Sequence, residues 1–240
     1  MTPTRVNISA LRKRFGPLEV LRGVDSTIAP GRITAIVGPN AAGKTTLIKT
    51  ILGMVRPDSG SVLVDDAAVG RDPAYRERIG YMPQAARFPE QLSGREVIGL
   101  LSAVRGRRNE LDRELITLLR LEPHLDRPVR TLSGGTRQKL NAAVSFLFRP
   151  SLLILDEPTA GLDPVAAGLL KDKVLRAPGE GTTVILTSHI MSEVEELAQD
   201  LVFLVEGSVV YQGPVAALLE QSGESRLERA IAGILSGAAA

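Results

Sequence analysis

The sequence contains no cysteine and no tryptophan, and aromatic residues make up only 3% of its 240 positions. The lack of cysteine excludes disulfide bonds and thiolate metal sites. Charges of one sign do not dominate either, since 29 lysines and arginines face 27 aspartates and glutamates; a net charge of +2 gives no reason to expect direct nucleic-acid binding. With 44% hydrophobic residues, the chain has a globular composition and enough length to bury a sizeable core.

Long apolar runs are also missing. No uninterrupted apolar segment approaches the roughly 18 residues that a membrane-spanning helix needs. The first residues, MTPTRVNISALRKRFG, lack the apolar centre of a signal peptide. We therefore expect a soluble cytoplasmic protein whose membrane role, if it has one, depends on a partner.

The apolar segments that are present are short, rich in β-branched residues and alternate with helical patterns, which predicts an α/β fold with a mostly parallel sheet. The expected strands are Ile33–Val37, Ser61–Val64, Leu152–Leu155, Thr183–Thr187, Leu201–Val205 and Ser208–Tyr211. A helix is expected from Pro214, and the small residues of Gly233–Ala240 are expected to form a frayed tail.

Between Pro89 and Arg130 the strand pattern disappears and helical spacing takes over. We predict an inserted helical lobe with helices over Arg95–Val104 and Leu111–Leu121. One apolar stripe of this lobe is formed by Val97, Leu100, Leu101 and Val104.

The strongest single motif is GPNAAGKTT, Gly38 to Thr46, which lies between the expected strand Ile33–Val37 and a helical pattern. It matches the phosphate-binding loop G-x-x-x-x-G-K-[ST] in its required strand–loop–helix context. The glycines let backbone N–H groups point inward, and the helix start offers its positive end to an anion. Lys44 would contact the β- and γ-phosphates, and the Thr45 hydroxyl would be one ligand of Mg²⁺.

A second motif, LLILDEP, places Asp156 and Glu157 at the end of an apolar strand. A carboxylate at the end of a buried parallel strand is the usual partner of a phosphate loop, because it contacts Mg²⁺. Glu157 is suited to act as general base toward the attacking water. Together the two motifs predict a nucleotide-hydrolysing enzyme.

The ordered set GPNAAGKTT, YMPQ, LSGGTRQ, LLILDEP, AGLD and SH resembles the nucleotide-binding subunit of an ATP-binding-cassette (ABC) transporter, from Phe15 to Gly213. The resemblance implies a P-loop nucleotidase core with a mostly parallel sheet, a small antiparallel β part and the inserted helical lobe. Within one domain over residues 1–240, the core then covers 1–88 and 132–220, the lobe covers 89–131, and 221–240 is a short tail.

The resemblance also implies a role for each motif residue. Gln84 contacts Mg²⁺ and the attacking water, His189 contacts the γ-phosphate, Asp163 lines a dimer seam, and Phe15 stacks on adenine. The implied catalytic residues are Lys44, Gln84, Glu157 and His189. The implied Mg²⁺ ligands are Thr45, Gln84 and Asp156. The implied ATP-binding residues are Phe15, Gly38, Pro39, Asn40, Ala41, Ala42, Gly43, Lys44, Thr45, Thr46, Gln84, Ser133, Gly134, Gly135, Asp163 and His189.

Two positions depart from the family pattern. Ala41 stands where many members have glycine, so a loop position that favours positive φ carries a methyl group, for which we expect a modest effect on affinity. Thr136 replaces the frequent glutamine after LSGG, at a position that is not a phosphate ligand in the family.

The tripeptide Leu-Ser-Gly occurs twice. At Leu92–Gly94 we predict a helix cap, in which Ser93 and Glu96 form a capping box. At Leu132–Gly135 the glycine pair and the cap residue Ser133 predict a second phosphate grip. In the family this signature closes over the γ-phosphate held by another copy, in a head-to-tail dimer.

The implied partners are a second copy of the chain and a membrane permease whose coupling helix docks near Ala85–Val97, at the cytoplasmic face of the inner membrane. Longer stretches around the phosphate loop, YMPQ and SHIMSEVEELAQD resemble the ATPase of the copper-processing transporter for nitrous oxide reductase maturation, which would add a periplasmic maturation protein. A soluble ABC-type ATPase acting on nucleic acid or a protein complex remains the alternative. The short gap from Thr46 to Leu132 argues against the long coiled coil of chromosome-maintenance ATPases.

Overall fold

The computed structural model describes residues 5–70, 73–106 and 111–237. The chain divides into two compact units. The first unit consists of Met1–Arg76 together with Ile185–Ala240, and the second consists of Glu77–Val184. Strand β8 (Thr183–Thr187) carries the chain from the second unit back into the first.

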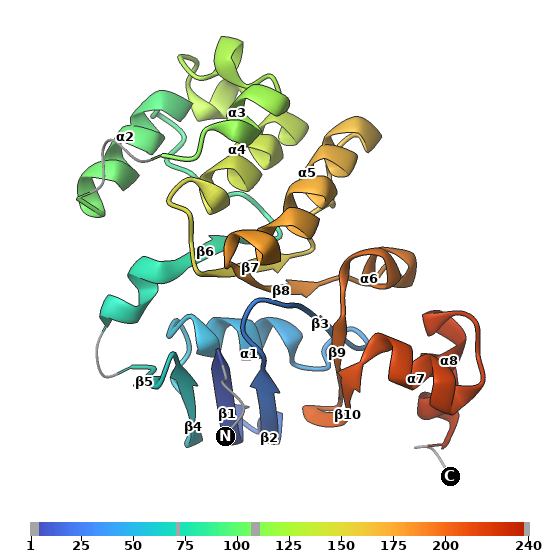
Figure 1. Cartoon of the computed structure of the whole chain (residues 1–240). Helices are drawn as coiled ribbons and strands as arrows, with labels where there is room; N and C mark the ends of the chain where they lie inside the picture. Colours follow the sequence, from blue (N-terminus) through green and yellow to red (C-terminus); the bar gives the residue numbers. More distant parts are fainter. Residues whose placement is uncertain (1–4, 71–72, 107–110, 238–240) are drawn as a thin grey trace. The chain divides into compact units, whose positions relative to one another are not determined.

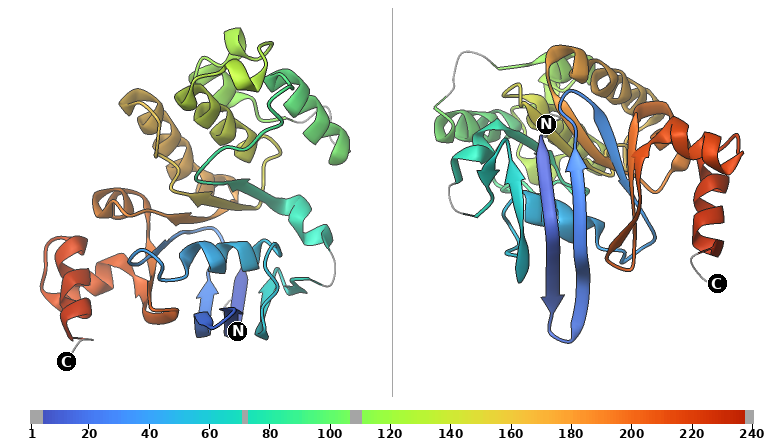
Figure 2. Two further views of the ribbon diagram at one scale, coloured as in Figure 1. Left: turned by 180° about the vertical axis from the view of Figure 1, so that it is seen from behind. Right: turned by 60° about the horizontal axis from the view of Figure 1, so that its bottom comes forward.

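The first unit contains an antiparallel sheet with the strand order β2-β1-β4-β5. Its strands are β1 (Val6–Phe15), β2 (Leu18–Ile28), β4 (Ser59–Val64) and β5 (Ala67–Ala68). Strands β1 and β2 form the long hairpin drawn in blue in Figure 2. The hairpin was not among the predicted strands, because its apolar residues alternate with charged ones and only one face is buried.

The same unit contains the strands that position the phosphate loop (Figure 1). Strand β3 (Ile33–Val37) runs parallel to β9 (Asp200–Val205), which pairs antiparallel with β10 (Ser208–Pro214). All five residues of β3 are buried, as expected for a strand covered on both faces. The predictions of strands over Ile33–Val37 and Leu201–Val205 are confirmed, the second to within one residue at its start.

The described residues of this unit include the helices α1 (Lys44–Ile51), α6 (Met191–Leu197), α7 (Val215–Ser222) and α8 (Leu227–Gly237). The helix expected from Pro214 is confirmed as α7. The expectation of a frayed tail is wrong for residues 233–237, because α8 continues to Gly237, although this last part of the helix is mostly exposed. Residues 238–240 lie outside the described part.

In its described residues, the second unit has a parallel pair of strands, β6 (Ile79–Met82) and β7 (Leu152–Asp156), together with several α-helices (Figure 1). The helices are α2 (Gly94–Val104), α3 (Glu114–Leu118), α4 (Gly134–Phe146) and α5 (Pro164–Arg176). Short 3-10 helices, η2 (Glu122–His124), η3 (Val129–Thr131) and η4 (Ala177–Glu180), connect them, and η1 (Pro73–Arg78) lies at the unit boundary.

The predicted apolar stripe of α2 is only partly buried. Val97 is 3% exposed, but Leu100 is 51% and Val104 is 77% exposed. The helix instead packs through Gly94, Val97, Ile98 and Ser102, whose spacing of three to four residues also defines one helical face. Sequence periodicity allowed both faces, and packing selected the one that includes a small residue and a serine.

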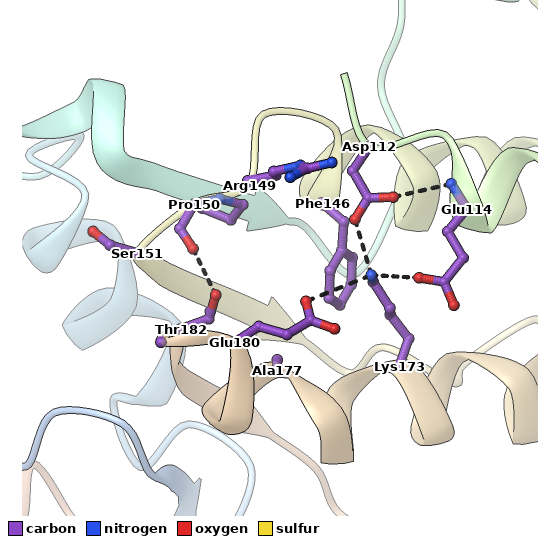
Figure 3. A pocket seen from close by; sticks show the side chains of 11 residues that line it. Asp112, Glu114, Phe146, Arg149, Pro150, Ser151, Lys173, Ala177, Glu180 and Thr182 are labelled. Atoms are coloured by element: carbon purple, nitrogen blue, oxygen red, sulfur yellow. Dashed lines mark hydrogen bonds and ion pairs between the residues drawn. The ribbon is translucent and has the colours of Figure 1, made fainter. Parts of the chain in front are cut away.

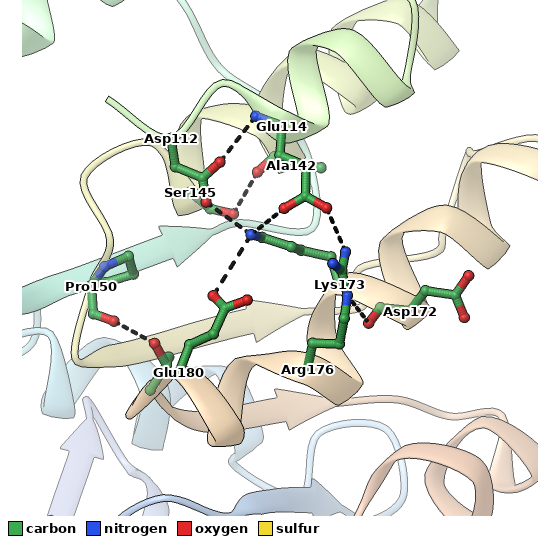
Figure 4. Close-up of polar contacts among 10 residues, drawn as sticks. Asp112, Glu114, Ala142, Ser145, Pro150, Asp172, Lys173, Arg176 and Glu180 are labelled. Carbon is green, nitrogen blue, oxygen red and sulfur yellow. Dashed lines mark hydrogen bonds and ion pairs between the residues drawn. The ribbon is translucent and has the colours of Figure 1, made fainter. Parts of the chain in front are cut away.

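Helix α5 is joined to the start of α3 by a buried lysine (Figures 3 and 4). Lys173 is only 3% exposed, and its Nζ lies 2.6 Å from Glu114 Oε2, 2.9 Å from Asp112 Oδ2 and 3.8 Å from Glu180 Oε2. Burial by itself would lower the pKa of Lys173, but these carboxylates outweigh it and the pKa is raised. The cavity of about 540 Å³ beside this network is lined by paired charges, which indicates a structural joint.

Candidate nucleotide-binding and hydrolysis site

The phosphate loop Gly38–Gly43 joins the buried strand β3 to helix α1, as predicted. A Cβ on Gly38 would lie 2.1 Å from the carbonyl oxygen of Leu204, and a Cβ on Gly43 would lie 2.9 Å from that of Val20. Both glycines also have positive φ, at 155° and 105°. The two positions therefore admit glycine alone, and the loop is held tightly against its own scaffold.

Lys44 folds back over this loop. Its Nζ donates to the carbonyl oxygens of Gly38 at 2.7 Å and Pro39 at 2.9 Å, so the ammonium group sits at the mouth of the curled backbone. Ala41 has φ of 62°, which confirms that this position needs a left-handed backbone despite its methyl group. Asn40, Ala41 and Thr45 are exposed, and the loop is open to a ligand.

In the second unit, Asp156 and Glu157 end strand β7. Asp156 is 6% exposed, whereas Glu157 is half-buried and has φ of 52°, so the chain turns sharply between the two carboxylates. Tyr81 on the neighbouring strand β6 reports on this environment: burial, followed by the charge of Asp156, raises its pKa to about 12. The buried carboxylate of Asp156 is suited to metal binding, and the half-buried carboxylate of Glu157 is suited to proton abstraction.

The loop that contains Gln84 is held by side chains of helix α4. Asn141 Nδ2 donates to the carbonyl oxygen of Pro83 at 2.8 Å, and Gln138 Nε2 donates to that of Gln84 at 3.3 Å. Both donors are buried, with exposed fractions of 3% and 5%, while Gln84 is exposed. The backbone of the loop is therefore fixed and the side-chain amide of Gln84 remains accessible.

Helix α4 begins at the signature residues. Ser133 is its N-cap: the Ser133 Oγ accepts from the Thr136 N–H at 3.1 Å and lies 2.8 Å from the Thr136 hydroxyl, which confirms the predicted cap. Within the described part of the chain, the N–H groups of Gly134 and Gly135 have no acceptor. This helix start therefore presents unsatisfied donors and a positive dipole end to solvent.

Asp163 caps the next helix, α5, by accepting from the Ala166 N–H at 2.9 Å. Its other carboxylate oxygen lies 2.6 Å from Nζ of Lys139 on helix α4. Lys139 and the Ala166 N–H together lower the pKa of Asp163, which keeps this carboxylate ionised. The backbones of the two loops come near each other beside this ion pair, since a Cβ added to Gly135 would lie 3.5 Å from the Gly161 carbonyl oxygen.

His189 and Phe15 are the remaining predicted ATP contacts, and both belong to the first unit. His189 follows β8 in an exposed turn that Ser188 organises by accepting from the Ile190 N–H at 3.0 Å. Phe15 ends strand β1 and is 50% exposed. The Lys13 ammonium group lies over its ring, 5.3 Å from the ring centroid. An exposed aromatic face of this kind is available for stacking.

Three residues of the second unit were not among the predicted site residues: Gln138, Lys139 and Asn141. All lie in the helix that follows the signature, where the sequence GGTRQKLN gives only a polar start to an amphipathic helix. Their partners, Pro83, Gln84 and Asp163, lie more than twenty residues away along the chain, so local pattern could not reveal them.

The predicted Mg²⁺ ligands have the right chemistry for this ion. A threonine hydroxyl at Thr45, an amide oxygen at Gln84 and a carboxylate at Asp156 are hard oxygen donors, which Mg²⁺ prefers. Residues 5–70, 73–106 and 111–237 contain no group of three or more histidine, cysteine or acidic side chains that could hold a metal. A site with a single carboxylate that completes its shell with phosphate and water is compatible with that finding.

None of the helices in the described ranges is both long and apolar enough to cross a membrane.

The first unit supplies a strand, a phosphate loop and a helix, and the second supplies the Asp156–Glu157 strand end and the open start of the signature helix. These features define a P-loop ATPase of the ATP-binding-cassette type. The family model described as "ABC transporter" matches residues 21–160. The chain therefore belongs to the ABC transporter family, as an ATP-hydrolysing subunit whose activity is coupled to transport.

Relatives agree with this assignment over nearly the whole chain. The chain is 36% identical to a daunorubicin resistance ATP-binding protein of Streptomyces coeruleorubidus, over 95% of this chain and 74% of the relative. It is 35% identical to a Nod factor export ATP-binding protein of a Rhizobium species, over 92% of this chain and 74% of the relative. A lantibiotic transport ATP-binding protein of Streptococcus pyogenes is 34% identical over 86% of this chain and 90% of its own length.

Solved structures give the same result. The structure of an ATP-binding subunit of an ABC transporter matches with a TM-score of 0.91 and 28% identity, over 97% of this chain and all of the other. A dimeric ATP-binding cassette with bound ADP and phosphate matches with a TM-score of 0.78, and at 21% identity it supports the fold alone. The predicted α/β fold with a mostly parallel sheet and an antiparallel part is confirmed.

Proposed function

We propose that the chain hydrolyses ATP as a head-to-tail homodimer, in which the phosphate loop of one copy and the signature of the other enclose each nucleotide. The observation that carries this proposal is the open start of helix α4, where Gly134 and Gly135 offer unsatisfied N–H groups next to the Ser133 hydroxyl. A phosphate group satisfies such donors and is stabilised by the helix dipole. The phosphate loop holds its own nucleotide, so the second grip serves a nucleotide held by another copy.

Each motif residue then has a distinct task. Lys44 binds the β- and γ-phosphates, and Glu157 takes a proton from the attacking water. Gln84 and His189 orient that water and the γ-phosphate, which requires side chains with both donor and acceptor atoms. When bound, Mg²⁺ neutralises phosphate charge, and Thr45, Gln84 and Asp156 would hold it.

The remaining contacts bind and align the nucleotide. Phe15 stacks on the adenine ring, and Asp163 communicates between the two sites across the dimer seam. The backbone of the phosphate loop surrounds the phosphates. This backbone group comprises Gly38, Pro39, Asn40, Ala41, Ala42, Gly43, Lys44, Thr45 and Thr46.

ATP binding favours the closed dimer and hydrolysis releases it, because only the closed form has both halves of each site. To turn this motion into transport the chain needs a membrane permease, whose coupling helix we place near Ala85–Val97, beside Gln84 and the lobe 89–131. Leu100 and Val104 are exposed apolar side chains of helix α2, which begins within that range, and they support an interface there. The subunit would then be peripheral to the cytoplasmic face of the inner membrane.

The relatives named above act in drug resistance, Nod factor export and lantibiotic transport. We propose an exporter-type system on that basis. The finer resemblance of the phosphate loop, YMPQ and SH segments to the copper-processing ATPase of nitrous oxide reductase maturation remains a prediction about cargo. Co-purification with the permease from solubilised membranes, followed by mass identification, tests it: a permease encoded with drug-export genes would contradict the copper assignment.

The general-base assignment is tested with Glu157→Gln, which keeps the shape of the side chain and removes its basicity. We expect steady-state ATPase activity to fall by at least about 100-fold, as for loss of a general base, while ATP-dependent dimerisation measured by light scattering becomes stronger. Glu180→Gln is a matched control, because Glu180 belongs to the Lys173 network. Retained turnover in Glu157→Gln would reject the assignment.

The alternative, a soluble ABC-type ATPase acting on nucleic acid or a protein complex, makes a different prediction for the same purification. Recovery of the chain with DNA or RNA, or in a complex without a permease, would overturn the transport proposal.

A further inference from the structure

Helix α4 contacts three functional loops of the second unit at once. Its start is the signature Ser133–Gly135, its buried side chains hold the loop of Gln84, and Lys139 holds the loop of Asp163. We propose that Gln138, Lys139 and Asn141 are positioning residues. When a phosphate group binds at the signature, they fix the loop of Gln84 and the loop of Asp163. This inference rests on the proposed function, since it needs a phosphate at the signature.

The first arm of this connection is buried and polar. Gln138 and Asn141 lie three residues apart, and therefore on one face of the helix, with 3.4 Å between Asn141 Nδ2 and Gln138 Oε1. Their buried amides donate to the carbonyl oxygens of Gln84 and Pro83 in part-buried hydrogen bonds. Because breaking these bonds would leave the buried amide donors without acceptors, the loop backbone follows the helix when the helix moves.

The second arm is an ion pair on the adjacent face. Lys139 Nζ lies 2.6 Å from Asp163 Oδ2, while Asp163 Oδ1 caps helix α5 through the Ala166 N–H at 2.9 Å. The side chain of Lys139 is 25% exposed and that of Asp163 is 51% exposed. The ion pair is therefore a weak contributor to stability. Its geometry nevertheless sets the direction of the carboxylate, because Asp163 is held by Lys139 and by the Ala166 N–H together.

The electrostatics connect these arms to the ligand. A phosphate at the start of α4 adds negative charge at the end of the helix from which Lys139 and Gln138 also extend. One rigid helix of 13 residues then carries the displacement to both loops, because a helix moves as a body.

Lys139→Met tests the exposed arm without burying or exposing a polar core group. We expect kcat for ATP hydrolysis to fall about three- to tenfold, the range for residues that carry coupling, with the affinity of the monomer for a fluorescent ATP analogue unchanged. Lys139→Arg should restore kcat because it restores the ion pair. The control is Lys171→Met, also on a helix of this unit and outside the α4 contacts described above.

A second measurement follows the loops directly. In the Glu157→Gln background, amide hydrogen exchange of residues 83–88 should slow when ATP is added, and Asn141→Ala should abolish that ATP-dependent slowing while the thermal unfolding transition stays cooperative. Wild-type kcat in Lys139→Met together with undiminished ATP protection in Asn141→Ala would overturn the inference. If the unmodified chain neither hydrolyses ATP nor dimerises, the proposed function fails instead, so the two failures are distinguishable.

Discussion

Two helices of this chain begin with the same tripeptide, Leu-Ser-Gly, and only one of them is suited to bind an anion. At the start of α2, Ser93 and Glu96 form a capping box, and the Arg95 N–H donates to the Leu125 carbonyl oxygen at 2.9 Å. Gly94 is buried, and a Cβ there would lie 3.1 Å from Leu125 Cδ2. The N–H groups of Arg95 and Glu96 are therefore bonded within the protein itself.

At the start of α4 the same cap residue is present, but no described segment covers the first turn as Leu125 does at α2. The corresponding N–H groups, those of Gly134 and Gly135, have no acceptor in the described part of the chain, and Ser133 is exposed. We propose that this difference makes the start of α4 a ligand site, because no neighbouring segment of the described chain covers its first turn. The second glycine matters because it leaves room for a phosphate group to approach the backbone.

The largest expected effect comes from placing a negative charge in the open first turn. In Gly135→Asp, the Cβ at position 135 would meet only the Gly161 carbonyl oxygen, at 3.5 Å, which is ordinary van der Waals contact. Acidic residues in a first turn favour the helix, and the unfolding temperature should not fall. The carboxylate would repel the γ-phosphate, and we expect ATPase activity to drop by at least about 100-fold, which corresponds to about 2.7 kcal/mol of barrier.

Gly135→Ala is the matched control, because it adds the Cβ without the charge. An ATPase loss as large as that of Gly135→Asp would mean that space, and not charge, decides the function of this position.

A smaller and more symmetrical effect is expected from removing the two cap serines. Ser93→Ala and Ser133→Ala should each destabilise the fold by about 1 kcal/mol, because each serine accepts an N–H of its own helix. For a chain of this size that is a fall of about 2–4 °C in the unfolding temperature. Differential scanning calorimetry and ATPase assays on the same samples separate the roles: only Ser133→Ala should also lose activity, and a loss in Ser93→Ala would break the comparison.

Much of the site was predictable because its signals are local. The phosphate loop, the Asp156–Glu157 strand end and both serine caps depend on residues within a few positions of one another, and the fully buried strands β3 and β8 have mostly apolar, β-branched-rich sequences. The packing choices were not predictable. The first turn of α2 is covered by Leu125, which lies about thirty positions along the chain. The exposure of Leu100 and Val104 depends on which of two apolar faces the helix buries.

The first hairpin shows the same limit for the fold. Strands β1 and β2 carry charged residues on their exposed face, and their pairing of Val6 with Ile28 is a long-range contact that alternation alone does not single out. The hydrogen bonds from helix α4 to the Gln84 loop were equally unpredictable, since Gln138 and Asn141 look like ordinary polar positions until their acceptors at Gln84 and Pro83 are known.

The composite site is tested most directly by mixing two inactive variants, Lys44→Ala and Gly135→Asp. A mixed dimer has one site that contains both defects and one that contains neither, because the phosphate loop and the signature of each site come from different copies. With random pairing of equal amounts, half of the dimers are mixed and half of their sites are intact, so we predict recovery of about a quarter of the unmodified activity. Activity that stays at the level of the separate variants would contradict the account.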